Sequence, residues 1–135
     1  MSAMTDYLEV ELRKHIFRTG SFTKPTVLGV ALFTAAPSDA GGGTEVTGGS
    51  YARVNVAPLD ANWSGASATT GLTDNVAAIT FPTASASWGT VTHFAIFDAT
   101  TAGNMLIWGA LTASKTVGSG DTFSFAIGDL DVTFA

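Results

Sequence analysis

The chain has 135 residues, of which only 13% are charged, with a formal net charge of −5 and no cysteine. This length predicts a single domain, residues 1–135, with a sizeable core. The lack of cysteine excludes disulfides, thiolate nucleophiles and cysteine-ligated metal sites. An acidic chain repels nucleic acid and anionic membranes, so we expect neither as a partner.

Charge and hydropathy together favour an assembly. Residues 1–24 carry a net charge of +1 and the remaining residues −6, while the mean hydropathy is positive. The longest apolar run, residues 27–33, is far too short to span a bilayer, and the acids near the start are unlike a signal peptide. We therefore expect a soluble protein made in a cytoplasm. Its few charges predict a surface of small residues that is partly buried in an oligomer, for which we predict a homotrimer.

An N-terminal helical segment, residues 1–24, begins the predicted fold. A helix is predicted over residues 5–17, where a threonine and an aspartate can cap the start. Leu8, Leu12 and Ile16 recur every four residues and share one face, which we expect to pack on the body or on a neighbouring subunit. Arg13 belongs to a basic cluster that either suits the end of the helix dipole or contacts an acidic partner.

Short strands are predicted for the rest of the chain, residues 25–135. Two of them carry apolar residues at both odd and even positions, which is typical of strands buried on both faces, and in the others apolar and polar residues alternate. The predicted strands cover residues 26–34, 51–56, 75–81, 91–99, 104–113, 121–128 and 129–135. Their number and spacing predict a mainly β fold, an antiparallel β-sandwich that is jelly-roll-like, with the one N-terminal helix.

Two local patterns refine this prediction. The stretch DATTAGN, residues 98–104, separates two strong apolar runs and predicts a hairpin. Alternation within the last two strands predicts inward side chains, namely Phe123, Phe125, Ile127, Leu130, Val132 and Phe134.

A glycine-rich stretch, GGGTEVTGG at residues 41–49, raises the question of a phosphate site. Phosphate loops of the Walker and dinucleotide types open a helix, whereas a strand follows here. The stretch has no lysine and places Glu45 where a cation would help. We therefore interpret it as a connection between strands, in which glycine supplies positive φ angles. Loops at the end of a sandwich also meet partners, which makes Glu45 a candidate interface residue.

No catalytic, cofactor or metal residue is predicted, and we expect no enzyme. The chain has two histidines, and His93 would point to the opposite face from Asp98, so they cannot act as a base and its orienting acid. Asp129 and Asp131 are too few ligands for a calcium cage. Trp63 could stack on a sugar, although packing of its loop onto the sandwich is the simpler interpretation. The candidate interface residues are thus Leu8, Leu12, Arg13, Ile16, Glu45 and Trp63.

Three stretches resemble a family of small tailed-phage virion proteins commonly labelled phage tail fibre protein. They are DYLEVELRKHIFR, LGVALFTAAPSDAGGGTEVTGGSYARV and ASASWGTVTHFAIFDATTAGNMLIWGAL. The resemblance covers nearly the whole chain. It implies a structural component of the virion, made in the host bacterial cytoplasm, with no catalytic residues and with other virion proteins, major capsid or tail, as partners.

Size and repeats bear on the place in the virion. A domain of this length is on the order of 40 Å across, and the sequence has no heptad, collagen or β-helix repeat to build a shaft. We therefore expect a capsid decoration or cement protein on the particle exterior. The alternatives are a tail-fibre or tail-tip module that contacts the host surface, and a small carbohydrate-binding domain.

Overall fold

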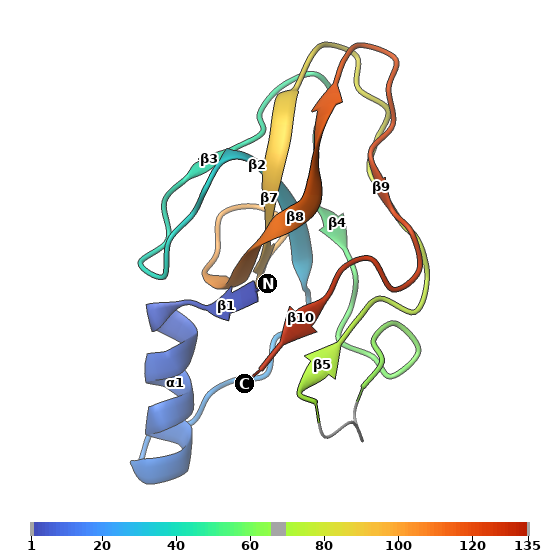
Figure 1. The fold of residues 1–135 in the computed structure, drawn as a ribbon. Coiled ribbons are helices and arrows are strands. Elements are labelled where there is room, and N and C mark those ends of the chain that lie inside the picture. The colour runs from blue at the N-terminus through green and yellow to red at the C-terminus, as the bar shows by residue number, and fades with distance from the viewer. Residues whose placement is uncertain (1, 66–69, 135) are drawn as a thin grey trace.

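A computed structural model describes residues 2–65 and 70–134. The chain folds into antiparallel strands with one helix near the N-terminus, as predicted (Figure 1). In chain order the elements are β1 (Ser2–Met4), α1 (Asp6–Phe17), β2 (Gly29–Ala35), β3 (Thr44–Glu45), β4 (Val54–Asn55), β5 (Leu72–Thr73), β6 (Ile79–Thr80), β7 (Gly89–Phe97), β8 (Met105–Val117), β9 (Ser124–Phe125) and β10 (Val132–Thr133).

The main sheet has six strands in the order β1-β8-β7-β2-β3, and β4 pairs with β2 beside β3. The hairpin predicted at residues 98–104 joins β7 to β8, where Ile96 lies opposite Ile107. Its turn needs two residues with positive φ, Ala102 at 51° and Gly103 at 77°. Glycine adopts that conformation at no steric cost. Two further pairs, β10–β5 and β6–β9, complete the strands.

Both faces of the main sheet are buried, as the apolar runs predict. One face carries Leu32 and Phe94 and packs against β6, β9 and β10 in the larger core. Because side chains alternate along a strand, the neighbouring residues Phe33 and Ala95 point the other way into a smaller core. A pocket lies on this second face, lined by Phe33 and Phe97 together with the start of α1 and the glycine-rich stretch.

Two inward assignments near the C-terminus are wrong. Ile127 is 70% exposed and Phe134 is also exposed. Strand β9 ends at Phe125, and the chain then turns, with the Asp129 amide donating to the Ala126 carbonyl. This turn ends the alternation at Ile127, while Phe134 follows the last paired residue of β10.

Candidate functional site

An interrupted edge strand organises the first pocket. β3 pairs with one end of β2 and β4 with the other, and residues 47–53 leave the edge between them. Leu32 lies opposite this gap. Its amide donates to the Tyr51 hydroxyl (3.0 Å), and its carbonyl accepts from the Val46 amide (2.9 Å). A side-chain hydroxyl thus takes the place of a missing strand partner, which leaves the buried amide paired.

Glu45 and Arg53 form an ion pair across the same gap. The Arg53 Nε and Nη2 atoms donate to the two carboxylate oxygens at 2.7 and 2.8 Å. The Tyr51 hydroxyl donates to Glu45 Oε1 (2.9 Å). Burial raises the pKa of Tyr51, and the Glu45 carboxylate raises it further, so the phenol keeps its proton and remains a donor. The side chain of Arg53 is 8% exposed and that of Glu45 is 24% exposed.

The guanidinium also fixes the β7–β8 turn. Its Nη1 atom donates to the carbonyls of Ala99 (3.1 Å) and Ala102 (2.7 Å). It lies 3.6 Å from the ring centroid of Phe97, which stacks on Phe33 with a centroid separation of 6.4 Å. One cation therefore joins the edge of the sheet, the turn and the smaller core.

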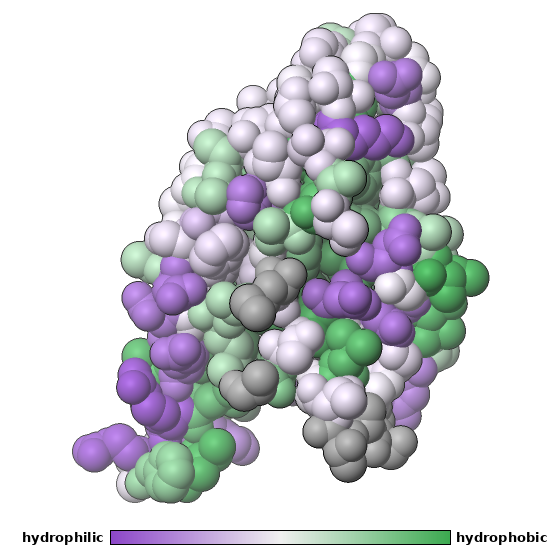
Figure 2. Space-filling view, in the orientation of Figure 1, coloured by the Kyte–Doolittle hydropathy of each residue, from purple (hydrophilic) through white to green (hydrophobic). Residues whose placement is uncertain are grey.

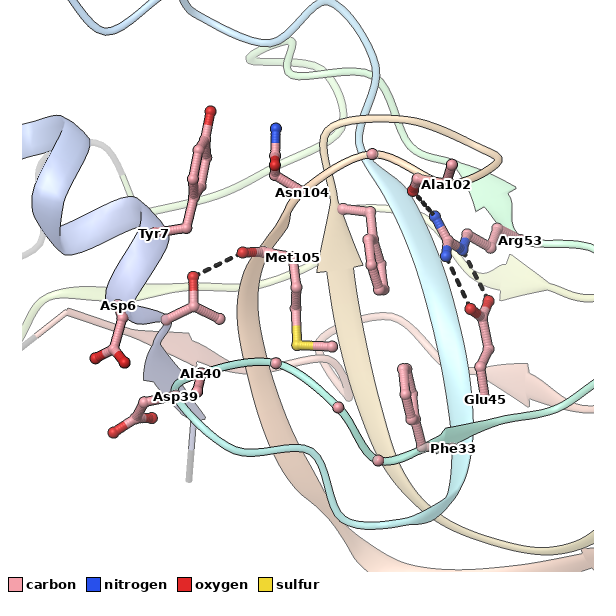
Figure 3. Close-up of a pocket in the computed structure, with 16 residues that line it drawn as sticks. Asp6, Tyr7, Phe33, Asp39, Ala40, Glu45, Arg53, Ala102, Asn104 and Met105 are labelled. Carbon is pink, nitrogen blue, oxygen red and sulfur yellow. Dashed lines mark hydrogen bonds and ion pairs between the residues drawn. The ribbon is translucent and has the colours of Figure 1, made fainter.

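These groups line a pocket of about 460 Å³, and we call it the ion-pair pocket. Figure 3 shows Met105, Phe33 and a second ring at its centre, with Tyr7 and Asn104 on one side and the Glu45–Arg53 pair on the other. The glycine-rich stretch closes one edge through residues 41–43. All three guanidinium nitrogens bind protein oxygens, so the pocket's one cation is already used and the site is poorly suited to a phosphate.

A second hollow, of about 550 Å³, lies beside α1, and we call it the α1 groove. Leu8 and Leu12 form its wall on the helix, while Trp63 and Val132 face them from the body. Figure 2 shows a notch between α1 and the β5–β10 region, with apolar surface on the inner side of the helix. The groove is thus mostly apolar, unlike the ion-pair pocket.

The predicted helix face is divided in two by the structure. Thr5 caps α1 by accepting from the Leu8 amide. Leu8 is buried in the core and Leu12 packs partly against it, so these residues contact the body as expected. Ile16, which shares their face, is 66% exposed because the helix extends past the edge of the body. Its predicted contact with a neighbouring subunit stays a prediction.

The remaining candidate residues do not form one site with the helix. Trp63 is half-buried, and its indole nitrogen donates to the Val56 carbonyl (3.2 Å), so it packs a loop onto the body. Glu45 lies in the ion-pair pocket, and Arg13 lies on the exposed side of α1. Each of these keeps its predicted interface role as a prediction.

Sequence reasoning missed the role of Arg53. A signal existed, because it is the only lysine or arginine between Lys24 and Lys115. A single cation in an apolar, alternating strand indicates a buried partner, since a buried charge needs one. Which carboxylate pairs with it depends on the strand pairing. Among residues 2–65 and 70–134, no group of three or more histidine, aspartate or glutamate side chains is placed to hold a metal.

Residues 3–133 match the family described as "Podophage GP4 fiber I protein gp80". The chain belongs to this fibre family. The resemblance to phage tail fibre proteins is thereby confirmed, and the protein is a virion structural component of the fibre type. No curated protein matches the chain. Among the residues that the structure describes, no helix is long and apolar enough to cross a membrane.

Proposed function

We propose that this protein is a compact module of a virion fibre, at the fibre tip or another site facing the host, and that it has no catalytic activity. The observation that carries the proposal is the family match over residues 3–133, which spans the helix and all the strands except the outermost residues. The lack of a shaft repeat in the sequence supports a terminal module over a segment of the shaft.

Capsid decoration is the second candidate. It is supported by the small size of the protein, 135 residues in the expected single domain, because a small exterior domain can be repeated at the symmetry axes of a shell. The half-buried packing of Trp63 and its bond to Val56 support a structural role for that residue, and no observation favours glycan binding there.

Copy number separates the two candidates. We would purify virions and measure the amount of this protein relative to the major capsid protein by quantitative mass spectrometry, with gold-labelled antibody to locate it by electron microscopy. A fibre module should be rare and located at one vertex or on the tail. A copy number comparable to that of the major capsid protein, with label over the whole shell, would refute the fibre proposal and support decoration.

We further propose that the protein acts as a homotrimer in contact with other virion proteins. The low fraction of charged residues supports burial of surface in an assembly. Ile16 and Phe17, which are adjacent and exposed at the end of α1, would be removed from water in such an assembly. Light scattering on the purified protein measures the number of subunits, and a monomer both in solution and on the virion would refute the trimer.

A further inference from the structure

The far end of α1 carries most of the exposed positive charge of the protein. Residues 12–38 contain four of the six lysine and arginine residues and no aspartate or glutamate. All four of these cations are exposed, namely Arg13, Lys14, Arg18 and Lys24. Of the other two, Arg53 is buried in its ion pair and Lys115 lies in β8. One end of one helix and the residues that follow it therefore form a cationic surface on an acidic protein.

Exposed apolar side chains gather beside these cations. Ile16 and Phe17 are 66% and 80% exposed, and both lie within one helical turn of Arg13. Leu59 and Phe134, which line the α1 groove, are 58% and 47% exposed. Figure 2 shows the notch of the groove next to α1, whose end extends away from the strands in Figure 1. We call these four apolar residues and the four cations the α1 end surface.

Few acids oppose the cations of this surface. Glu11 pairs with Lys14 (2.8 Å), and the other three cations form no ion pair within residues 2–65 and 70–134. Among the described residues that line the groove, Asp60 is the one acid and Lys24 the one cation. Exposed charges act over about 8 Å at physiological ionic strength. A partner at this surface therefore meets the local positive charge rather than the negative net charge of the whole chain.

We propose that the α1 end surface docks on an anionic lipid surface, one whose headgroups carry phosphate. Amphipathic helices bind such surfaces by placing apolar side chains at the boundary of headgroups and acyl chains, while lysine and arginine contact the headgroups. Fluid acyl chains fill the hollow beside a projecting helix end, whereas a folded protein partner would need a ridge of matching shape. The expectation of no membrane partner rests on the net charge of the whole chain, which does not describe this local excess of positive charge.

This inference rests on the proposed fibre function, because a fibre module that faces the host comes close to the lipid of the cell envelope. Burial of Ile16 and Phe17 in a homotrimer would withdraw them from a lipid surface, so one copy cannot use them for both contacts. The experiment therefore measures vesicle binding and self-association on the same samples.

Binding is measured by flotation with unilamellar vesicles of phosphatidylcholine, either alone or with about 30 mol% phosphatidylglycerol as the anionic lipid. Phe17→Ser removes the most exposed apolar side chain of the surface, and its matched control is Ile127→Ser, because Ile127 is 70% exposed and lies outside the α1 groove. Arg18→Gln removes one cation of the surface, and Lys115→Gln removes an exposed cation elsewhere. Circular dichroism confirms folding, and light scattering without vesicles measures self-association.

We expect the wild type to bind anionic vesicles at least about tenfold more tightly than neutral ones, and salt to weaken that binding. Phe17→Ser should lower the binding constant about tenfold, and Arg18→Gln should lower it about fivefold. Both controls should bind within about twofold of the wild type, since their positions lie beyond the reach of the lipid surface.

Equal binding to anionic and neutral vesicles would overturn the proposal, and so would equal losses in the two variants and their controls. Tight binding of soluble polyglutamate without binding to vesicles would overturn it in favour of an acidic protein partner. Self-association that Phe17→Ser abolishes, with no vesicle binding by the wild type, would assign the end of α1 to a subunit contact instead. Each of these results leaves the fibre proposal standing, because that proposal depends on copy number and location in virions.

Discussion

The Glu45–Arg53 pair provides the sharpest test of how this fold is stabilised. We consider Arg53→Met, which keeps an unbranched side chain over Phe97 but removes the guanidinium, and Glu45→Gln, which keeps the shape but removes the charge. The first change breaks two bonds to the carboxylate and two to backbone carbonyls. The second keeps an acceptor for the Tyr51 hydroxyl.

The expected magnitudes follow from burial. Breaking a buried ion pair by removing one partner costs about 3–5 kcal/mol. Because the Glu45 carboxylate keeps some contact with water, we expect Arg53→Met to lower the free energy of unfolding by about 3 kcal/mol. Glu45→Gln should cost about 2 kcal/mol, in the range of charged hydrogen bonds. The double variant should cost less than the two single changes together, and we expect a coupling energy of about 2 kcal/mol.

Urea denaturation of the four proteins in this double-mutant cycle measures that coupling. The chain offers its own control in the pair between Lys14 and Glu11, whose atoms are also 2.8 Å apart but which lies on the exposed surface of α1. Exposed pairs couple by about 0.2–1 kcal/mol. If the Glu45–Arg53 coupling is no larger than that of Lys14–Glu11, then burial does not strengthen the pair and the reasoning is wrong.

Three further predictions concern the core, the glycines and pH. Leu8→Ala should cost about 2–5 kcal/mol in thermal or urea unfolding, because Leu8 is fully packed, and Leu12→Ala clearly less. Gly42 and Gly43 share a φ near +76°, but only at Gly43 would a Cβ meet backbone, within 3.0 Å of residues 35–37; Gly43→Ala should therefore lower the melting temperature more than Gly42→Ala. Burial raises the pKa of the Tyr51 hydroxyl, so as the pH rises the unfolded chain loses the phenol proton before the folded protein does. The free energy of unfolding should therefore fall as the pH rises above about 10, and it should fall less steeply in Tyr51→Phe.

The long elements of this fold could be predicted from the sequence because each carries many repeats of its pattern. The predicted strands at residues 26–34, 91–99 and 104–113 correspond to β2, β7 and β8, with ends displaced by a few residues. The helix begins and ends close to the predicted residues because a capping threonine and a four-residue apolar repeat both signal it.

Three of the short strands were not predicted, because two or three residues show no periodicity, whereas β4, β6, β9 and β10 lie within longer predicted ranges. Strands β1, β3 and β5 lie outside every predicted strand. Each exists only because a distant segment offers a partner, as when Met4 pairs with Ile107. The contacts of the ion-pair pocket could not be predicted for the same reason. Arg53 reaches the carbonyls of Ala99 and Ala102 only because of the order of the strands in the sheet, and no local pattern in the sequence contains that order.

The structure of the glycine-rich stretch, residues 41–49, bears on whether a partner could dock there. Its sequence predicts only a connection between strands, but Thr44–Glu45 within the stretch form strand β3, which pairs with β2. Gly49 accepts from the indole nitrogen of Trp88 (2.9 Å), and a Cβ there would come within 3.0 Å of that ring. Glu45 is held by Arg53 and Tyr51. A partner that bound the Glu45 carboxylate would have to replace three hydrogen bonds inside the protein, so this stretch is poorly suited to docking through Glu45.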